Sequence, residues 1–394
     1  MYGRHLFICI LPFLFLFYSC YCDETLDLNT YIIDLDASPL SRWTNVIEEF
    51  RLPLNIFVEN IRSAVPSPFF YVSEAIALRL DHYIPQPYHD EIHSISSAAN
   101  IRLSDVILLN LIYELRAHCT SILAVSTNGT FIHGRNLDYD LNTDLLRLLT
   151  FQAKFIKTTN KSQVVYYSIH FAGSVGLFTA NRPNFYSLSI NQRQTNNGEW
   201  WMNALMAILH LNTMPLFIFT RILFENYHSY EDIKYELKTK HLIAPVYFIL
   251  TNGENEGLVI TRNRLNSANT IVLNSSNPLW YLVQTNYDHW LEDPLNDSRR
   301  TTAENVLGVM YNQSQLLDNT IYDVLSVIPV LNKYTVYTSI MSPTNNLTIP
   351  IYAKIRTLDH KSKYLLTLRQ KFQRSKTSFI EKVVKFITFA FLLV

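Results

Sequence analysis

Cys119 stands where a hairpin would bring a thiol close to a carboxylate. Asn128-Gly129 is a favoured pair for a tight two-residue turn, and the residues on either side of it are mostly β-branched or apolar, which is typical of strands. With this pair as the turn, Thr127 faces Thr130, and counting outward sets Cys119 opposite Asp138. A thiol reacts as its thiolate, so a neighbouring cation or base would make Cys119 a nucleophile.

Arg135 is the cation closest to this pair in the sequence. Side chains alternate between the faces of a strand, so Arg135 points away from Asp138 unless the backbone bends at Gly134. Interior cysteines are often packing residues, and Gly134 to Asp138 also fits a solvated strand end. Two interpretations of Cys119 stay open at this point: a buried small hydrophobe, or a reactive thiol.

The elements that must position these groups change character at Cys119. Before it, apolar residues at three- and four-residue spacing predict helices over 43–50, 54–64, 71–82 and 103–115. After the hairpin, strand-like runs occur at 150–156, 164–170, 185–190, 246–250, 257–261, 271–273, 282–285 and 334–339. Helical runs lie between them, at 200–211, 216–225, 231–240, 303–311 and 321–327. This order predicts an α+β fold of layered sheets with outer helices, preceded by a helical segment of about one hundred residues.

The N-terminus predicts entry into the secretory pathway. Arg4 and His5 precede a short apolar run, and polar residues follow Cys22, an order typical of a removable signal peptide over residues 1–22. Six glycosylation sequons agree with that route: Asn128, Asn160, Asn274, Asn296, Asn312 and Asn346. The four cysteines lie at positions 9, 20, 22 and 119, so the mature protein would keep one thiol and could form no intrachain disulfide.

Composition narrows the class of function further. The 394 residues carry no formal net charge and 48% of them are hydrophobic, which fits a folded globular protein and argues against binding to nucleic acid. We find no metal-ligand spacing and no glycine loop that could cradle a phosphate. The sequence therefore predicts neither a cofactor nor a metal.

Several motifs resemble the acid ceramidase and N-acylethanolamine acid amidase family of N-terminal-nucleophile cysteine hydrolases. The first are Cys119-Thr-Ser-Ile-Leu-Ala and His133-Gly-Arg-Asn-Leu-Asp-Tyr139. Others follow in the same order, at Phe171–Gly176, Ile243–Ile249, Val259–Asn263, Val283–Trp290, Arg299–Thr301 and Val330–Tyr337. The resemblance covers the chain from about residue 30 to about residue 355. It implies an αββα sandwich over residues 119–360, the β subunit, after a helical α subunit over residues 23–118.

The resemblance also implies how such an enzyme would work. The precursor cleaves itself between His118 and Cys119, and the freed α-amine of Cys119 then serves as the base for its own thiol. Arg135 would supply positive charge beside the nucleophile, and Asp138 would orient the amine. Two further residues complete the implied catalytic set, with Asn286 donating to the oxyanion and Arg299 holding the group together.

Two features of this chain depart from the family pattern, and one sequon lies close to a predicted site residue. Gln192 in Ser189-Ile-Asn-Gln-Arg193 stands where the family usually has Glu, a change that removes a charge. The stabilising disulfide that members generally carry is absent. A glycan on Asn296 would lie three residues from Arg299, so we expect that sequon to be unoccupied.

The implied substrate is a lipid amide, either ceramide or an N-acylethanolamine, in the lysosome or outside the cell. Contact with a membrane surface could come from Leu54–Phe57, Pro68–Val72 or the basic and apolar tail over residues 361–394, although core packing explains the first two equally well. A saposin-like lipid-presenting protein is a further candidate partner.

Alternatives to this function include an N-terminal-cysteine amidase acting on bile-salt or penicillin-like amides, and a lipid-binding homologue that has lost catalysis. A papain-type protease fits poorly, because no Cys-Gly-Ser-Cys-Trp run surrounds Cys119.

Overall fold

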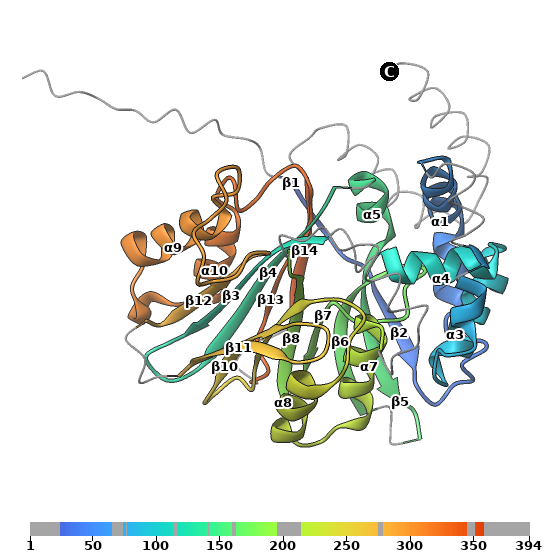
Figure 1. The fold of residues 1–394 in the computed structure, drawn as a ribbon, viewed down its shortest axis with the longest axis horizontal. Coiled ribbons are helices and arrows are strands. Elements are labelled where there is room, and N and C mark those ends of the chain that lie inside the picture. The colour runs from blue at the N-terminus through green and yellow to red at the C-terminus, as the bar shows by residue number, and fades with distance from the viewer. Residues whose placement is uncertain are drawn as a thin grey trace, which may run out of the picture.

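Two stacked β-sheets form the centre of the molecule (Figure 1). The structure is a computed structural model, and it describes residues 24–64, 74–75, 77–112, 117–140, 142–159, 163–194, 214–274, 279–344 and 351–357. Strands β3 and β4 of one sheet pack against β8 and β9 of the other. Alternate side chains of these strands fill the space between the sheets, which is why both strands of the β3–β4 hairpin are almost wholly buried.

The six-stranded sheet has the order β1 (Glu24–Asp27), β14 (Ile351–Thr357), β13 (Thr335–Met341), β4 (Phe131–Tyr139), β3 (Ala117–Val125) and β12 (Tyr281–Gln284). The eight-stranded sheet has the order β11 (Ser267–Leu273), β10 (Gly257–Arg262), β9 (Val246–Thr251), β8 (Tyr186–Gln192), β7 (Thr179–Arg182), β6 (Gln163–Phe171), β5 (Thr150–Lys157) and β2 (Thr30–Asp34). Neighbouring strands are antiparallel except for β2 and β5, which are parallel.

Helices cover the outer faces of both sheets (Figure 1). Helices α9 (Arg299–Met310) and α10 (Asp318–Leu325) pack on the six-stranded sheet, and α7 (Leu216–Asn226) and α8 (Tyr230–Thr239) pack on the eight-stranded sheet. Other helices, several of which cluster beside the sandwich, are α1 (Thr44–Ala64), α3 (Tyr88–Ala99), α4 (Leu103–Ile112) and α5 (Thr143–Leu149). The α+β prediction and its αββα layering are confirmed.

The segment before Cys119 is not purely helical, which corrects the prediction for residues 23–118. Its strand β1 pairs with β14 at the edge of one sheet, and β2 pairs with β5 at the edge of the other. Both strands are short and partly exposed, so they lack the apolar alternation that identifies a strand in a sequence. If the chain were cut before Cys119, the N-terminal part would still be held by both sheets.

Other differences from the predicted elements are local. The helices expected at 43–50 and 54–64 are one helix, α1, which continues through Pro53. Leu54 and Phe57 are fully buried on this helix, and burial of its apolar face offsets the cost of about 3 kcal/mol for an interior proline. Core packing, and not membrane contact, therefore explains Leu54–Phe57. Helices α3 and α5 and strands β7 and β14 were not predicted.

A buried ion-pair network ties α3 to α7 across the chain. Glu91 of α3 is fully buried and accepts hydrogen bonds from both terminal nitrogens of Arg221 on α7. The same carboxylate accepts a bond of 2.6 Å from Arg42 Nη1 and one of 2.7 Å from Trp43 Nε1. Arg221 Nε also donates to Glu225 at 2.7 Å. Such a network is costly to break, because each remaining charge would stay buried without its partner.

No helix in the described part of the chain has the length and apolar character needed to cross a membrane. The helix expected at 200–211, the segment Pro68–Val72, and the tail over residues 361–394 lie outside the described residues.

Candidate active site

The β3–β4 hairpin has a register one residue away from the predicted one. Cys119 pairs with Leu137, and His118 pairs with Asp138. The loop between the strands has three residues, not two, and its last residue is Gly129 at φ +84°. The amide of Ser126 donates to the carbonyl of residue 130 at 2.9 Å, which closes that loop. A three-residue loop ending in a left-handed glycine is the next most common hairpin connection, and it displaces the register by one.

This register places Cys119 and Arg135 on the same face of the sheet. Arg135 lies two residues from Leu137, the partner of Cys119, so all three side chains point toward the eight-stranded sheet. The predicted bend at Gly134 is therefore unnecessary. A Cβ on Gly134 would lie 2.2 Å from Ile321 Cγ2 of α10, so the glycine instead allows that helix to pack closely on β4.

Arg135 holds the thiol of Cys119 directly. Its Nη2 lies 2.9 Å from Cys119 Sγ, and both side chains are fully buried. The guanidinium also donates to the carbonyls of Phe178 at 2.5 Å and Ile190 at 2.9 Å, and to Thr179 Oγ1. Burial raises the pKa of the Cys119 thiol above its ordinary value, and the positive charge of Arg135 partly opposes this rise. The thiol therefore needs a base before it can attack.

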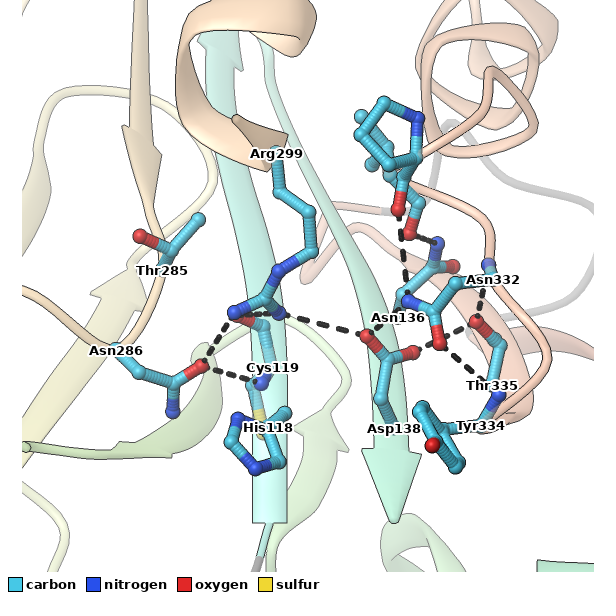
Figure 2. Close-up of polar contacts among 12 residues, drawn as sticks. His118, Cys119, Asn136, Asp138, Thr285, Asn286, Arg299, Asn332, Tyr334 and Thr335 are labelled. Carbon is cyan, nitrogen blue, oxygen red and sulfur yellow. Dashed lines mark hydrogen bonds and ion pairs between the residues drawn. The ribbon is translucent and has the colours of Figure 1, made fainter. Parts of the chain in front are cut away.

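The backbone of Cys119 is held by two residues from a distant part of the chain (Figure 2). Its amide donates to Asn286 Oδ1 at 2.8 Å, and its carbonyl accepts from Arg299 Nη1 at 3.1 Å. Asn286 Nδ2 donates to the carbonyls of Ala117 at 3.1 Å and Gln192 at 2.8 Å. Both hydrogens of that amide are thus engaged while residue 117 is in place.

Arg299 is the link between the parts of the site. It is the first residue of α9, and Figure 2 shows its guanidinium between Asn286 and Asp138. Nη2 donates to Asn286 Oδ1 at 3.0 Å, and Nη1 lies 3.4 Å from Asp138 Oδ2. Asp297 binds the same guanidinium through both carboxylate oxygens, at 2.8 Å and 2.6 Å. A bidentate contact of this kind fixes the orientation of the guanidinium.

Asp297 is a site residue that the sequence analysis missed, because it was considered only as the middle of the Asn296 sequon. Burial raises its pKa, but the hydrogen bonds and the charge of Arg299 outweigh burial and leave the pKa below its ordinary value. The side chain of Asn296 is exposed beside it. The sequence feature that could have identified Asp297 is its position two residues before Arg299, where its carboxylate can reach the guanidinium.

Asp138 lies on the outer face, toward α9 and α10. It accepts bonds from Thr335 Oγ1 at 2.7 Å and Asn332 Nδ2 at 2.8 Å, in addition to its contact with Arg299. Burial raises the pKa of this carboxyl above its ordinary value, against the opposing effects of Arg299 and these donors. Asp138 therefore connects to the Cys119 backbone through Arg299, and Asn332 and Thr335 are two supporting residues that the sequence analysis did not identify.

The residue before Cys119 has a polar neighbour of its own. His118 is half-buried, and its Nδ1 lies 3.4 Å from Gln194 Nε2. Burial and the charge of Arg299 lower the pKa of His118, so the neutral imidazole is favoured. Gln192 contributes its backbone carbonyl to Asn286, an interaction that does not depend on its side chain.

All five predicted catalytic residues, together with His118, thus meet at one place. The side chains that donate to Cys119 are the guanidinium groups of Arg135 and Arg299, whose positive charge suits a developing anion and would repel a cation. This donor set favours acyl transfer to the thiol over metal chemistry.

Comparisons with known proteins agree with this site. The linear amide C–N hydrolases of the choloylglycine hydrolase family match residues 119–309, so the match begins at Cys119. The N-acylethanolamine-hydrolyzing acid amidase of Oryctolagus cuniculus is 38% identical over 314 residues, which cover 79% of this chain and 85% of the relative. The acid ceramidase of Pan troglodytes is 36% identical over 335 residues, which cover 80% and 83%. This chain belongs to the acid ceramidase and N-acylethanolamine acid amidase family.

A solved relative extends the agreement to the fold. The Caenorhabditis elegans ortholog of N-acylethanolamine-hydrolyzing acid amidase is 34% identical and superposes with a TM-score of 0.52, covering 59% of this chain and 95% of that structure. The chain has the N-terminal-nucleophile hydrolase fold, and it is an amidohydrolase that acts on linear amide C–N bonds.

Proposed function

We propose that this family member is a lysosomal or secreted hydrolase of fatty-acid amides that activates itself by cleaving the His118–Cys119 bond. The observation that carries the proposal is the pairing of Cys119 Sγ with Arg135 at 2.9 Å while Asn286 and Arg299 hold the backbone of the same residue. The family match beginning at Cys119 supports a mature chain that starts there.

Self-cleavage uses the thiol of Cys119 and the preceding peptide. Sulfur attacks the carbonyl carbon of His118, the carbon–nitrogen bond to Cys119 breaks, and the thiol proton passes to the departing amine. Water then hydrolyses the thioester, which leaves a carboxylate on His118 and restores the thiol. Asn286 and Arg299 would keep the peptide in place during this step, since they bind the amide and the carbonyl of Cys119.

The mature enzyme would use the new α-amine as its base. An unperturbed α-amine titrates at about 7.7–8.0, low enough to accept the thiol proton of Cys119 near neutral pH. The thiolate attacks the amide carbonyl, the substrate amine leaves with a proton, and water releases the fatty acid from the acyl-enzyme. Arg135 stabilises the thiolate.

Asn286 can become an oxyanion donor only when its amide is released. In the uncut chain both hydrogens of its Nδ2 are bound to the carbonyls of Ala117 and Gln192. Departure of residue 117 after cleavage would free one of them for the substrate. Asp138 would act on the amine of Cys119 indirectly, because Arg299 binds both Asp138 and the Asn286 oxygen that accepts from the Cys119 nitrogen.

The two parts of a cut chain would stay together as α and β subunits. Each sheet contains a strand from before Cys119, β1 in one and β2 in the other. The buried pair of Glu91 and Arg221 also joins them. An apolar cavity between helices of the two parts, lined by Ile92, Ile107 and Phe217, has the character that an acyl chain requires.

The substrate class is taken from the names of the relatives. One group hydrolyses N-acylethanolamines and the other is named for ceramide, and both are amides of fatty acids. The predicted signal peptide and sequons support a lysosomal or secreted location. Contact with a lipid surface, directly or through a saposin-like protein, follows from the insolubility of such substrates.

Intact mass of the protein made in a secretory host tests the proposal. After incubation at about pH 4.5 and about pH 7.5, on either side of the unperturbed histidine pKa, we expect fragments that meet between His118 and Cys119. Cys119→Ala should stay whole. Cleaved enzyme is then assayed with a ceramide, an N-acylethanolamine and a conjugated bile salt.

The outcomes separate the alternatives. An uncut wild type at both pH values would contradict self-processing and favour a lipid-binding homologue altered at Gln192. Cleavage with activity on the bile salt alone would contradict the fatty-acid amide assignment and favour the bile-salt amidases.

A further inference from the structure

A second cluster of reactive side chains lies in the part of the chain before Cys119, on α3. His89 and His93 are four residues apart, so they lie one turn apart on the same face of that helix. Their ring centroids are 4.3 Å apart. Asp81, which precedes the helix, places its largely buried carboxylate against both rings, 3.4 Å from His89 Nε2 and 3.0 Å from His93 Nε2.

We propose that Asp81, His89 and His93 bind a divalent transition-metal ion, with Zn²⁺ as the best fit. Their ligand atoms all lie within 4.8 Å of one another. Tetrahedral Zn²⁺ with bonds of about 2.0–2.1 Å brings its ligand atoms roughly 3.3 Å apart. Two of the observed separations, 3.0 Å and 3.4 Å, already match that spacing.

A second carboxylate orients one of the ligands. His89 Nδ1 lies 3.0 Å from Asp90 Oδ1, and that oxygen is itself held by Gln86 Nε2 at 2.8 Å. A carboxylate behind a ligand histidine fixes the proton on Nδ1 and leaves Nε2 as the free donor atom. In the neutral imidazole, that Nε2 lone pair then faces an oxygen of Asp81, an unfavourable contact of two acceptors that a metal ion between them would relieve.

The donor set indicates which ions would bind. Two imidazoles and one carboxylate suit Zn²⁺ and its neighbours in the first transition row, whereas Mg²⁺ and Ca²⁺ prefer sites made of oxygen. The side chains of His89 and His93 are 27% and 37% exposed, so the remaining coordination position faces solvent. The ion would tie Asp81 to the first turns of α3, the helix that carries the buried Glu91.

The sequence analysis overlooked this pair. His89-Asp-Glu-Ile-His93 has the spacing of two ligands on a helix, but the third ligand lies eight residues earlier and is brought into place only by the fold.

Calorimetric titration of the chelator-treated full-length protein with ZnCl₂ at about pH 7.5 tests the proposal. We expect one ion per chain, no uptake of Mg²⁺, and a melting temperature that rises with zinc. His93→Gln should abolish the strong site, and Asp90→Asn should weaken it by about 10- to 100-fold. His241→Gln, a change at an exposed histidine elsewhere, serves as the matched control and should bind as the wild type does.

Two kinds of result would overturn the site. One is the absence of specific binding, seen as a wild type that takes up no zinc or as a His93→Gln variant that binds zinc as tightly as the wild type does. The other is zinc that disappears in Cys119→Ala and persists in His93→Gln, which would place the ion on the catalytic thiol. Equal melting temperatures of the metal-free wild type and His93→Gln show that the variant is folded, so a loss of binding is a loss of the ligand. Neither result depends on self-cleavage.

Discussion

Asn286→Asp separates the two roles that the structure gives to this side chain. The substitution keeps Oδ1, which accepts from the Cys119 amide at 2.8 Å and from Arg299 at 3.0 Å. It replaces Nδ2 by an oxygen, so the bonds to the carbonyls of Ala117 and Gln192 are lost. Each lost bond costs about 1–3 kcal/mol, and the new carboxylate–guanidinium contact returns about 1.5–3 kcal/mol, so we expect a folded protein.

The two chemical steps should respond differently. Nδ2 is fully engaged in the uncut chain, so self-cleavage does not use it as an oxyanion donor and should slow by less than about tenfold, or about 1.4 kcal/mol. The mature enzyme would use the hydrogen released from Ala117, and its loss should lower kcat by about 10²- to 10³-fold, or about 2.7–4 kcal/mol.

The assay follows cleavage by mass and turnover with a fluorogenic fatty-acid amide, with kcat normalised to the cleaved fraction. Asn263→Asp makes the same change at an exposed asparagine and should leave both rates unaltered. Equal losses in the two steps, or a kcat within about threefold of wild type, would refute the assignment of Asn286 as a donor that cleavage releases.

Three further variants test other contacts of the structure. Arg135→Gln removes the cation beside Cys119, so the pKa of the Cys119 thiol should rise. Alkylation of that thiol by iodoacetamide at about pH 7 should then be slower than in the wild type, and an unchanged pH profile of alkylation would contradict the contact. Glu91→Ala removes the carboxylate that Arg42 and Arg221 share, leaving Arg221 with Glu225 alone. It should lower the free energy of unfolding by about 3–5 kcal/mol in urea titrations. Glu231→Ala, at an exposed ion pair, should change that energy by less than about 0.5 kcal/mol, and similar effects of the two changes would refute the buried network. The lowered pKa of Asp297 means that its contribution to stability is complete above the unfolded pKa of about 3.9 and is lost as pH falls through the lower folded value. The difference in unfolding free energy between wild type and Asp297→Asn should therefore be constant from about pH 7 to about pH 5 and shrink below about pH 4. A difference that already shrinks above about pH 5 would show that the pKa of Asp297 is not lowered.

The chain before Cys119 shows the limit of local patterns most clearly. Apolar spacing identified parts of α1 and α4, because one buried face repeats along each helix. The same criterion missed β1 and β2, which take their hydrogen bonds from β14 and β5 far along the chain. An edge strand with mixed polarity becomes a strand only when its partner is present.

The sequence by itself determined the alternation of strands and helices, the position of the hairpin and the choice of Cys119 as the candidate nucleophile, since these depend on neighbouring residues and on recognisable motifs. Only the tertiary structure decided which groups meet Cys119. The conformation of Gly129 moved the register by one residue, and that alone turned Arg135 toward the thiol and Asp138 away from it. Asn286 lies 167 positions from Cys119, and no local periodicity relates them. Their contact exists because β12, which ends two residues before Asn286, pairs with β3 in the six-stranded sheet.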